Sequence, residues 1–178
     1  MITWALRPQG TNWLVSTLAG SAGSIGSSNA SGTNALFNGI FGVAVDRQEN
    51  LIVSDSGNNL VRQVTSAGAV KTIAGRVEIT LSAGSVDGVG SEARFNRPGG
   101  LALDRFGNLY VADSGNSTIR VITPAGSIST IAGSVLNPGT NDGVGSDARF
   151  MSPGRMAVDS TGNLYVADSG AVRRITPA

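Results

Sequence analysis

The sequence lacks the two side chains on which many enzymes depend. Among 178 residues there is no cysteine and no histidine. Their absence excludes disulfides, thiolate and imidazole metal ligands, and catalysis by a thiol or an imidazole. We therefore expect no catalytic residue, no metal site and no cofactor, and we predict a protein that is not an enzyme.

Lysine, excess charge and long apolar runs are also scarce. Lys71 is the only lysine, and the net charge is +1. This balance argues against a general attraction to nucleic acid or to an anionic membrane. No apolar run approaches the roughly 18 residues of a membrane span, and residues 1–13 lack the basic start and apolar core of a signal peptide. A cytosolic protein and a processed chain or fragment both remain open.

The sequence does contain one long unit written three times. Residues 87–114 and 142–169 are nearly the same text, and residues 29–56 are a more divergent copy. Recurrence of a unit at a nearly constant spacing is the signature of a repeat architecture. We place the repeats at approximately 15–69, 70–127 and 128–178 of a single partial domain. Residues 1–14 form an N-terminal extension or the remnant of a preceding unit.

Each unit is predicted to be a four-stranded antiparallel meander. In the second copy, short apolar and β-branched segments are separated by glycine, asparagine and proline, at 100–104, 109–113, 118–123 and 128–133. Gly107 and Gly162 are expected to take the positive φ of a tight hairpin, which glycine adopts without a Cβ clash. The first copy has Glu49 there, which should cost stability locally.

The predicted strands are apolar on both faces. Leu101 and Leu103 alternate only with the small Ala102, whereas a half-solvated sheet alternates polar and apolar residues. Each unit should therefore be packed between two others, which predicts an all-β fold made of β-propeller blades, three per chain. A stacked solenoid would need parallel coils and shorter periods. We expect Phe95 and Phe150 to fill the core between blades; their glycine-rich segments lack the Lys-Ser/Thr of a phosphate loop.

Residues 97–126 and 152–178 resemble NHL repeats. The family pattern is a Pro-x-Gly strand ending in Asp, a Gly-Asn turn, a Tyr-Val-Ala-Asp strand and an Asn-x-x-Ile-Arg strand. Residues 97–126 have all four, and residues 152–178 have the Asp, the Gly-Asn turn and the Tyr-Val-Ala-Asp strand. The intervening "TIAG" and "DGxGxxAxF" segments resemble the bacterial long-repeat type, over roughly residues 13–178. The resemblance implies a propeller, typically of six blades, and suggests a bacterial extracellular or periplasmic protein. The third copy departs, because "SGAVRRI" is two residues shorter than "SGNSTIRVI".

Three blades are too few to close a propeller, which usually needs about four to eight. Two apolar blade faces would stay open, each of several hundred Å². The last copy also lacks its "STIAG" strand, while residues 13–20 supply an orphan one. We therefore expect a homodimer that closes one six-bladed ring, half from each chain, through the blade faces and the strand at 13–20. The alternative is a fragment of a longer six-bladed NHL protein, because residues 2–10 resemble 119–126.

Recurring charged residues are the first candidate sites. An aspartate and an arginine flank the second hairpin of each copy, and we expect one structural ion pair per blade; the alternative is a ring of arginines that binds an anionic ligand. A second recurring aspartate, beside the first hairpin, should accept backbone N–H groups, although such a set could also hold Ca²⁺. The pairs are Asp55 and Arg62, Asp113 and Arg120, and Asp168 and Arg173; the turn residues are Asp46, Asp104 and Asp159.

Long loops at 76–99 and 134–153 are where binding function is expected to concentrate. The candidate ligand-binding residues in or beside them are Arg94, Asn96, Arg97, Arg149, Ser152 and Arg155. We predict a binding or scaffold module whose partner is a protein or a carbohydrate. A Ca²⁺-dependent lactonase-like hydrolase and an RNA-binding NHL module remain alternatives; nucleic acid is the weaker one, because basic excess and exposed aromatic candidates are few.

Overall fold

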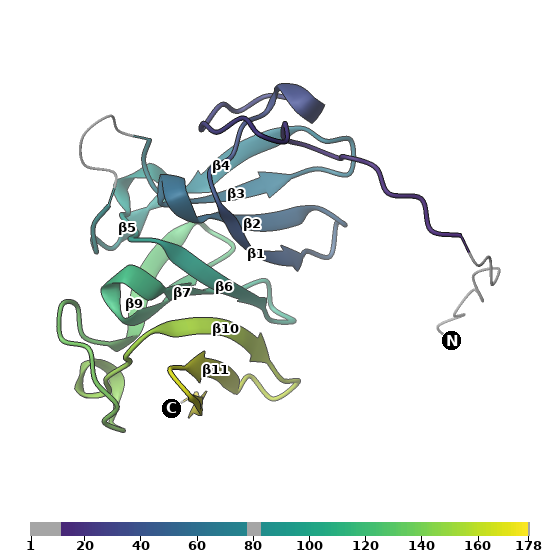
Figure 1. The fold of residues 1–178 in the computed structure, drawn as a ribbon. Helices are drawn as coiled ribbons and strands as arrows, with labels where there is room; N and C mark the ends of the chain where they lie inside the picture. The colour runs from purple at the N-terminus through teal and green to yellow at the C-terminus, as the bar shows by residue number, and fades with distance from the viewer. Residues whose placement is uncertain (1–11, 78–82, 178) are drawn as a thin grey trace.

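The computed structural model describes residues 12–77 and 83–177. In these residues the chain folds into three antiparallel sheets that follow one another in sequence, and Figure 1 shows them lying one beside the next. The helical segments described are short 3-10 turns. Within the described ranges, no helix is long and apolar enough to cross a membrane.

The three sheets are the predicted meanders, with strands in chain order, and we number them blades 1 to 3. Blade 1 contains β1 (Ile40–Val45), β2 (Leu51–Asp55), β3 (Leu60–Val64) and β4 (Val70–Ala74). Blade 2 contains β6 (Pro98–Leu103), β7 (Leu109–Asp113), β8 (Thr118–Ile122) and β9 (Ser127–Gly133), and β5 (Gly88–Val89) lies outside β9. Blade 3 has β10 (Pro153–Val158), β11 (Leu164–Asp168) and β12 (Ala171–Ile175).

Short 3-10 turns occupy equivalent places in the repeats. The loop that enters each blade contains one, and in blades 1 and 2 another joins the second strand to the third. The entering turns are η1 (Gly32–Asn34), η3 (Gly90–Glu92) and η5 (Gly145–Asp147), and the others are η2 (Ser56–Asn58) and η4 (Ser114–Asn116). Blade 3 instead uses a two-residue turn in which Ser169 has φ 43° and Gly170 has φ 92°, so the predicted shortening of this hairpin is confirmed.

The apolar faces of neighbouring blades pack against one another, as the double-sided pattern predicted. The loop phenylalanines fill both seams: Phe95 packs with Val61 of blade 1 and Val111 of blade 2, and Phe150 packs with Ile119 and Val166. Both phenylalanines are almost fully buried, which confirms their predicted role. Burial of one such side chain contributes about 1.5–3 kcal/mol.

Two glycines let the inner strands approach backbone to backbone. A Cβ on Gly42 would lie 2.6 Å from the carbonyl oxygen of Gly99, and one on Gly100 would lie 2.4 Å from that of Gly154. These distances are too short for any side chain. The equivalent position in blade 3 is Arg155, which is exposed.

The N-terminal segment does not pair with a sheet of its own chain. Residues 12–17 have no assigned secondary structure, and Trp13, Leu14 and Val15 are 90%, 94% and 91% exposed. Figure 1 shows this purple segment running away from the sheet of blade 1. The stretch at 2–10, which resembles 119–126, lies outside the described residues.

The first hairpin of each blade has the predicted conformation. Gly107 and Gly162 have φ of 89° and 92°, and Glu49 is held at 63°. A side chain in this left-handed region costs about 1–2 kcal/mol. The divergent first copy therefore stores strain at an exposed turn.

We predict that Glu49→Gly raises the free energy of unfolding by about 1 kcal/mol, because relief of the left-handed strain exceeds the added chain entropy of glycine. Urea-induced unfolding measures this change. The matched variant Gly107→Ala should be destabilised, since it introduces the strain that Glu49 carries. A Glu49→Gly variant less stable than the parent would contradict this explanation.

Candidate functional site

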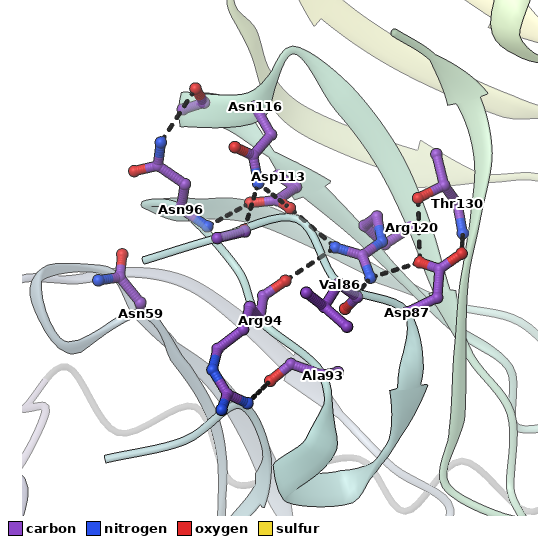
Figure 2. Close-up of polar contacts among 12 residues, drawn as sticks. Asn59, Val86, Asp87, Ala93, Arg94, Asn96, Asp113, Asn116, Arg120 and Thr130 are labelled. Carbon is purple, nitrogen blue, oxygen red and sulfur yellow. Dashed lines mark hydrogen bonds and ion pairs between the residues drawn. The ribbon is translucent and has the colours of Figure 1, made fainter. Parts of the chain in front are cut away.

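A buried arginine organises the polar interior of blade 2 (Figure 2). Arg120 lies on β8 with no exposed side-chain surface. Its Nη1 donates to Asp113 Oδ2 and to the carbonyl oxygen of Arg94, both at 3.0 Å. Its Nη2 donates to the carbonyl oxygen of Val86 at 2.9 Å and to Asp87 Oδ1 at 2.6 Å. One guanidinium thus binds the loop that enters its own blade at three points.

Asp113 holds the same loop from the end of β7. Its carboxylate accepts the backbone N–H of Asn96 at 2.7 Å and the Nδ2 of Asn116 at 2.8 Å, besides the bond from Arg120. Burial raises the pKa of Asp113 to about 6, although these donors and the positive charge of Arg120 lower it. All three partners donate to the carboxylate, which is the arrangement that an ionised carboxylate requires.

The arrangement recurs in the other two blades. Arg62 donates to Asp55 at 3.0 Å and to loop acceptors at Ser28, Asn29 and Leu36. In blade 3 the contact of Arg173 with Asp168 is longer, at 3.4 Å, and its loop acceptors are Asn141, Asp142 and Arg149. The structure therefore brings each recurring aspartate and arginine into contact.

Each of these arginines also lies over the loop phenylalanine. The guanidinium carbons of Arg62, Arg120 and Arg173 lie 4.6, 5.1 and 5.3 Å from the ring centroids of Phe37, Phe95 and Phe150. The Nε atoms of Arg62 and Arg120 are buried without a hydrogen-bond partner. Stacking of a desolvated guanidinium on a ring contributes about 2 kcal/mol, which offsets part of that cost.

The contacts of this network are the contacts of a structural element, because they are made within the chain itself. The Nη atoms of Arg120 donate to four acceptors of its own chain, and the pair with Asp113 is fully buried. A ligand anion would have to displace these bonds to reach the guanidinium. The network joins a loop, two strands and the inter-blade core within one blade.

Sequence reasoning missed one member of the network. Asn29, Asp87 and Asp142 begin the glycine-rich segments, and their side chains accept from Arg62, Arg120 and Arg173. Asp87 also accepts the backbone N–H and the hydroxyl of Thr130 on β9, at 3.2 and 3.1 Å. The identical "DGVGS" of residues 87–91 and 142–146 was the available signal.

The loop residues predicted to bind a ligand fall into two groups. Nη1 of Arg94 donates to the carbonyl oxygens of Ser91, Glu92 and Ala93, and Arg149 donates to those of Ser146 and Ala148. Asn96 Nδ2 donates to the carbonyl oxygen of Gly115 at 3.2 Å. Arg97, Ser152 and Arg155 are exposed.

The exposed group lies at the entrances of blades 2 and 3: Arg97 and Ser152 precede β6 and β10, and Arg155 lies on β10. The backbone N–H of Arg97 donates to Asn59 Oδ1 at 2.8 Å, which joins the entrance of blade 2 to the second hairpin of blade 1. Arg155 lies 5.9 Å from the ring centroid of Phe41, which is 52% exposed. We call Phe41, Arg97, Ser152 and Arg155 the loop face. It contains two cations and an aromatic ring, and two of its members, Phe41 on β1 and Arg155 on β10, are strand residues.

The aspartates of the first hairpins bind their own turns. Asp104 Oδ1 accepts the backbone N–H groups of Phe106 and Asn108 at 2.8 and 2.9 Å, and Asp46 and Asp159 accept equivalent bonds. Burial by itself raises the pKa of Asp104, but the hydrogen bonds from Asn108, Phe106 and Tyr110 leave it lowered. In the described ranges, no three acidic side chains gather as metal ligands would.

We predict that Arg120→Met lowers the free energy of unfolding by about 3–5 kcal/mol, because it leaves Asp113 buried without its cation. Arg173→Met should cost less, since Arg173 is 14% exposed and its partner Asp142 is 95% exposed. Arg105→Met, at an exposed turn, is the matched control. Urea-induced unfolding measures the three free energies of unfolding. Equal losses of stability in the Arg120 and Arg105 variants would contradict the structural role of Arg120.

Comparisons with known proteins agree with the repeat structure. Residues 95–122, which run from Phe95 to the end of β8, match the NHL repeat family. NHL repeat-containing protein 2 of Bos taurus is 40% identical over 126 residues, which cover 67% of this chain and 17% of that protein. The chain therefore spans about a sixth of the length of this relative.

Solved structures share the arrangement of blades. A structural genomics protein of Bacteroides thetaiotaomicron is 29% identical with a TM-score of 0.64, over 71% of this chain and 32% of that one. An auxiliary nutrient binding protein of Bacteroides ovatus is 23% identical with a TM-score of 0.68, over 83% and 39%, and this likeness concerns the fold alone. With its repeated motifs, its three meander sheets and these relatives, the chain belongs to the NHL-repeat proteins, and its repeats fold as blades of a β-propeller.

Proposed function

We propose that this protein is a non-catalytic β-propeller scaffold that binds a protein or carbohydrate partner through its loop face. We further propose that two copies close a six-bladed ring. One observation carries the assembly: at each end of the blade stack, apolar residues are exposed whose equivalents are buried inside the chain, although Ala35, Phe37 and Val53 of blade 1 are already covered by their own chain.

The outer face of blade 3 is the first of these. Its small and apolar positions match residues of blade 2 that the next blade buries. Val172 is 76% exposed, whereas its equivalent Ile119 is fully buried. Tyr165 is 37% exposed, whereas its equivalent Tyr110 packs into the seam between blades 2 and 3. Ala157 and Ala167 complete this face, and their equivalents in blade 2 are Ala102 and Ala112.

The outer face of blade 1 carries the residues that cover such a face elsewhere. In blade 2, Ala93, Phe95, Leu109 and Val111 pack against blade 1. The equivalents in blade 1 are clustered side chains of the same type, Ala35, Phe37, Leu51 and Val53. Val43 nearby is 57% exposed, whereas its equivalent Leu101 is 7% exposed. Blade 1 of a second copy is therefore a matching cover for blade 3, and two such seams give six blades.

The new seam differs from the internal ones at its inner edge. Gly42 and Gly100 allow inner strands to meet backbone to backbone, and Arg155 stands at this position in blade 3. An arginine there holds the two inner strands further apart. The seam between copies is thus weaker than the seams within a chain.

A longer chain that supplies further blades would bury the same two faces. The relatives are much longer than this chain, so the proposal concerns this polypeptide as it stands. Two copies that close a ring give twice the mass of this chain in solution, whereas a chain that needs further blades of its own does not form such a dimer.

The loop face supports the binding part of the proposal. Loops on a rigid scaffold carry recognition without disturbing the core. Arg97 offers a guanidinium group that recognises carboxylates with paired hydrogen bonds, and Phe41 offers an aromatic surface. We therefore favour a partner that presents carboxylate groups, such as an acidic polysaccharide.

We predict that multi-angle light scattering gives a mass near twice 18.0 kDa. Val172→Asp should yield monomer, because it places a charge in an apolar seam, and deletion of residues 1–20 should abolish assembly. Arg155→Gly should lower the dimer dissociation constant, since it restores close approach of the inner strands. Leu136→Asp, in an exposed loop, is the matched control. A soluble, well-folded parent monomer removes the ring proposal.

We predict that the chain binds immobilised polygalacturonate more tightly than neutral dextran. Arg97→Ala should weaken this binding roughly tenfold, the loss of one charge-assisted hydrogen bond. Arg105→Ala is the matched control, because Arg105 lies in a first hairpin, at the opposite end of the strands. Surface plasmon resonance measures both, and the same loss in both variants would mean that only net charge is sensed.

A further inference from the structure

Blade 3 contains both walls of a slot in which a fourth strand fits. In blade 2, β9 lies between β8 and the short strand β5, which pair with it on its two sides. In blade 3 the equivalent walls are β12 and residues 142–145. They line a cavity of about 970 Å³ with Phe150 and Leu164. Val144 and Val172 on these walls are 84% and 76% exposed.

One wall also offers an acceptor for a threonine. In blade 2, Asp87 accepts the N–H and hydroxyl of Thr130, and in blade 1 Asn29 accepts the hydroxyl of Thr72 at 3.3 Å. Asp142 is the equivalent in blade 3. It is bound by Arg173 at 2.7 Å, but its side chain is 95% exposed, and among the described residues no hydrogen bond joins it to a threonine.

The N-terminal segment has the sequence of the strand that fills such a slot. Residues 16–20 read "STLAG", where β9 reads "STIAG" and residues 71–75 read "KTIAG". Thr17 therefore matches Thr72 and Thr130. Val15 matches Ile128, which is 2% exposed in blade 2, whereas Val15 is 91% exposed.

The end of this segment already has the geometry of a fourth strand. Gly20, Gly75 and Gly133 have φ of 96°, 88° and 93°. The N–H of Gly20 donates to the carbonyl oxygen of Gly32 at 3.0 Å, as that of Gly75 donates to Gly90 at 3.1 Å. Ala19 packs against the cluster that contains Phe37, as Ala132 packs in the cluster of Phe150.

What Gly20 lacks is the neighbouring strand. A Cβ on Gly75 would lie 2.6 Å from the carbonyl oxygen of Asn59, and one on Gly133 would lie 2.4 Å from that of Ser117. These carbonyls precede the third strand of the same blade. A Cβ on Gly20 would meet only the ring of Phe37 within 4 Å among the described residues, at 3.2 Å. Residues 18–20 thus lie at the edge of blade 1 as the end of an outer strand, without the third strand that lies beside Gly75 and Gly133.

We infer that the slot between β12 and residues 142–145 is a strand-binding site, and that it binds residues 14–20 of a second copy. This inference deepens the proposed ring and rests on it. Thr17 donates to Asp142, and Val15 and Leu18 cover the apolar walls. A chain cannot fill its own slot, because residues 18–20 lie beside blade 1, while blade 3 is at the other end of the stack (Figure 1).

The pairing of β8 with β9 fixes the expected register. Val121 lies opposite Ser129 and Arg120 opposite Thr130, so Ser16 should lie opposite Arg174, and Thr17 opposite Arg173. The chain has no cysteine, which makes disulfide trapping clean. Directly opposed residues on paired strands lie within disulfide range.

The test mixes full-length Ser16→Cys with full-length Arg174→Cys under mild oxidation. We expect a disulfide-linked heterodimer on a non-reducing gel, and little product from Ser16→Cys mixed with Val172→Cys, which is two residues out of register. A parent dimer that gives no cross-link in this register overturns the strand site but leaves the ring. Cross-linking within one chain of the double variant Ser16→Cys/Arg174→Cys overturns the second copy as occupant.

An experiment with a synthetic peptide distinguishes an absent strand-binding site from an absent dimer. If the parent is monomeric, a peptide of residues 13–20 with cysteine in place of Ser16 is offered to Arg174→Cys. Capture keeps the strand site and discards the dimer, and no capture discards both.

The contact between Thr17 and Asp142 has its own readout. Thr17→Val should raise the dimer dissociation constant roughly tenfold, as expected for a hydrogen bond to a carboxylate, and it removes no contact within the single chain. In an Asp142→Ala background the same change should have little effect. Equal effects of Thr17→Val in both backgrounds would show that the two residues do not meet.

Discussion

Each blade of this protein has two apolar faces and no means of burying them alone. Small residues alternate with branched ones on the strands, so neither face can be left in water without cost. Neighbouring blades solve this inside the chain by packing on the phenylalanine of the connecting loop, Phe95 in one seam and Phe150 in the other. The loops that carry these two phenylalanines are thereby held in the seams.

The buried arginines make that packing specific. A phenylalanine can fill an apolar seam in several ways, but Arg120 binds its loop at Val86, Asp87 and Arg94 while stacking on Phe95. The ion pair with Asp113 supplies the countercharge that lets a guanidinium stay in the core. The exposed residues of the loop face are thereby held on a rigid frame, which is the condition for recognition by loops.

At the two ends of the stack, apolar residues lack the neighbouring blade that would bury them. Val172 and Val43 are exposed where their equivalents Ile119 and Leu101 are buried, and a strand-width slot remains beside β12. Residues 14–20 have the sequence of a fourth strand, and their last residues, 18–20, lie beside blade 1 at the opposite end. Arg155 stands where Gly42 and Gly100 allow close approach, so in the ring that we propose the seam between copies is weaker than the inner ones.

The sequence by itself determined the blades, their strands and their hairpins, because local patterns carry that information: apolar residues on both faces, and glycine where φ is positive. It also indicated Phe95 and Phe150 as core residues, since they recur in each long copy. Only the tertiary structure decided which acceptors surround Arg120, because Asp87 lies far from it in sequence and meets it through the folding of a loop. The same holds for the loop face, where Arg94 turns inward to backbone carbonyls and Arg97, three residues later, stays exposed; composition cannot separate two arginines whose difference is the direction of a loop.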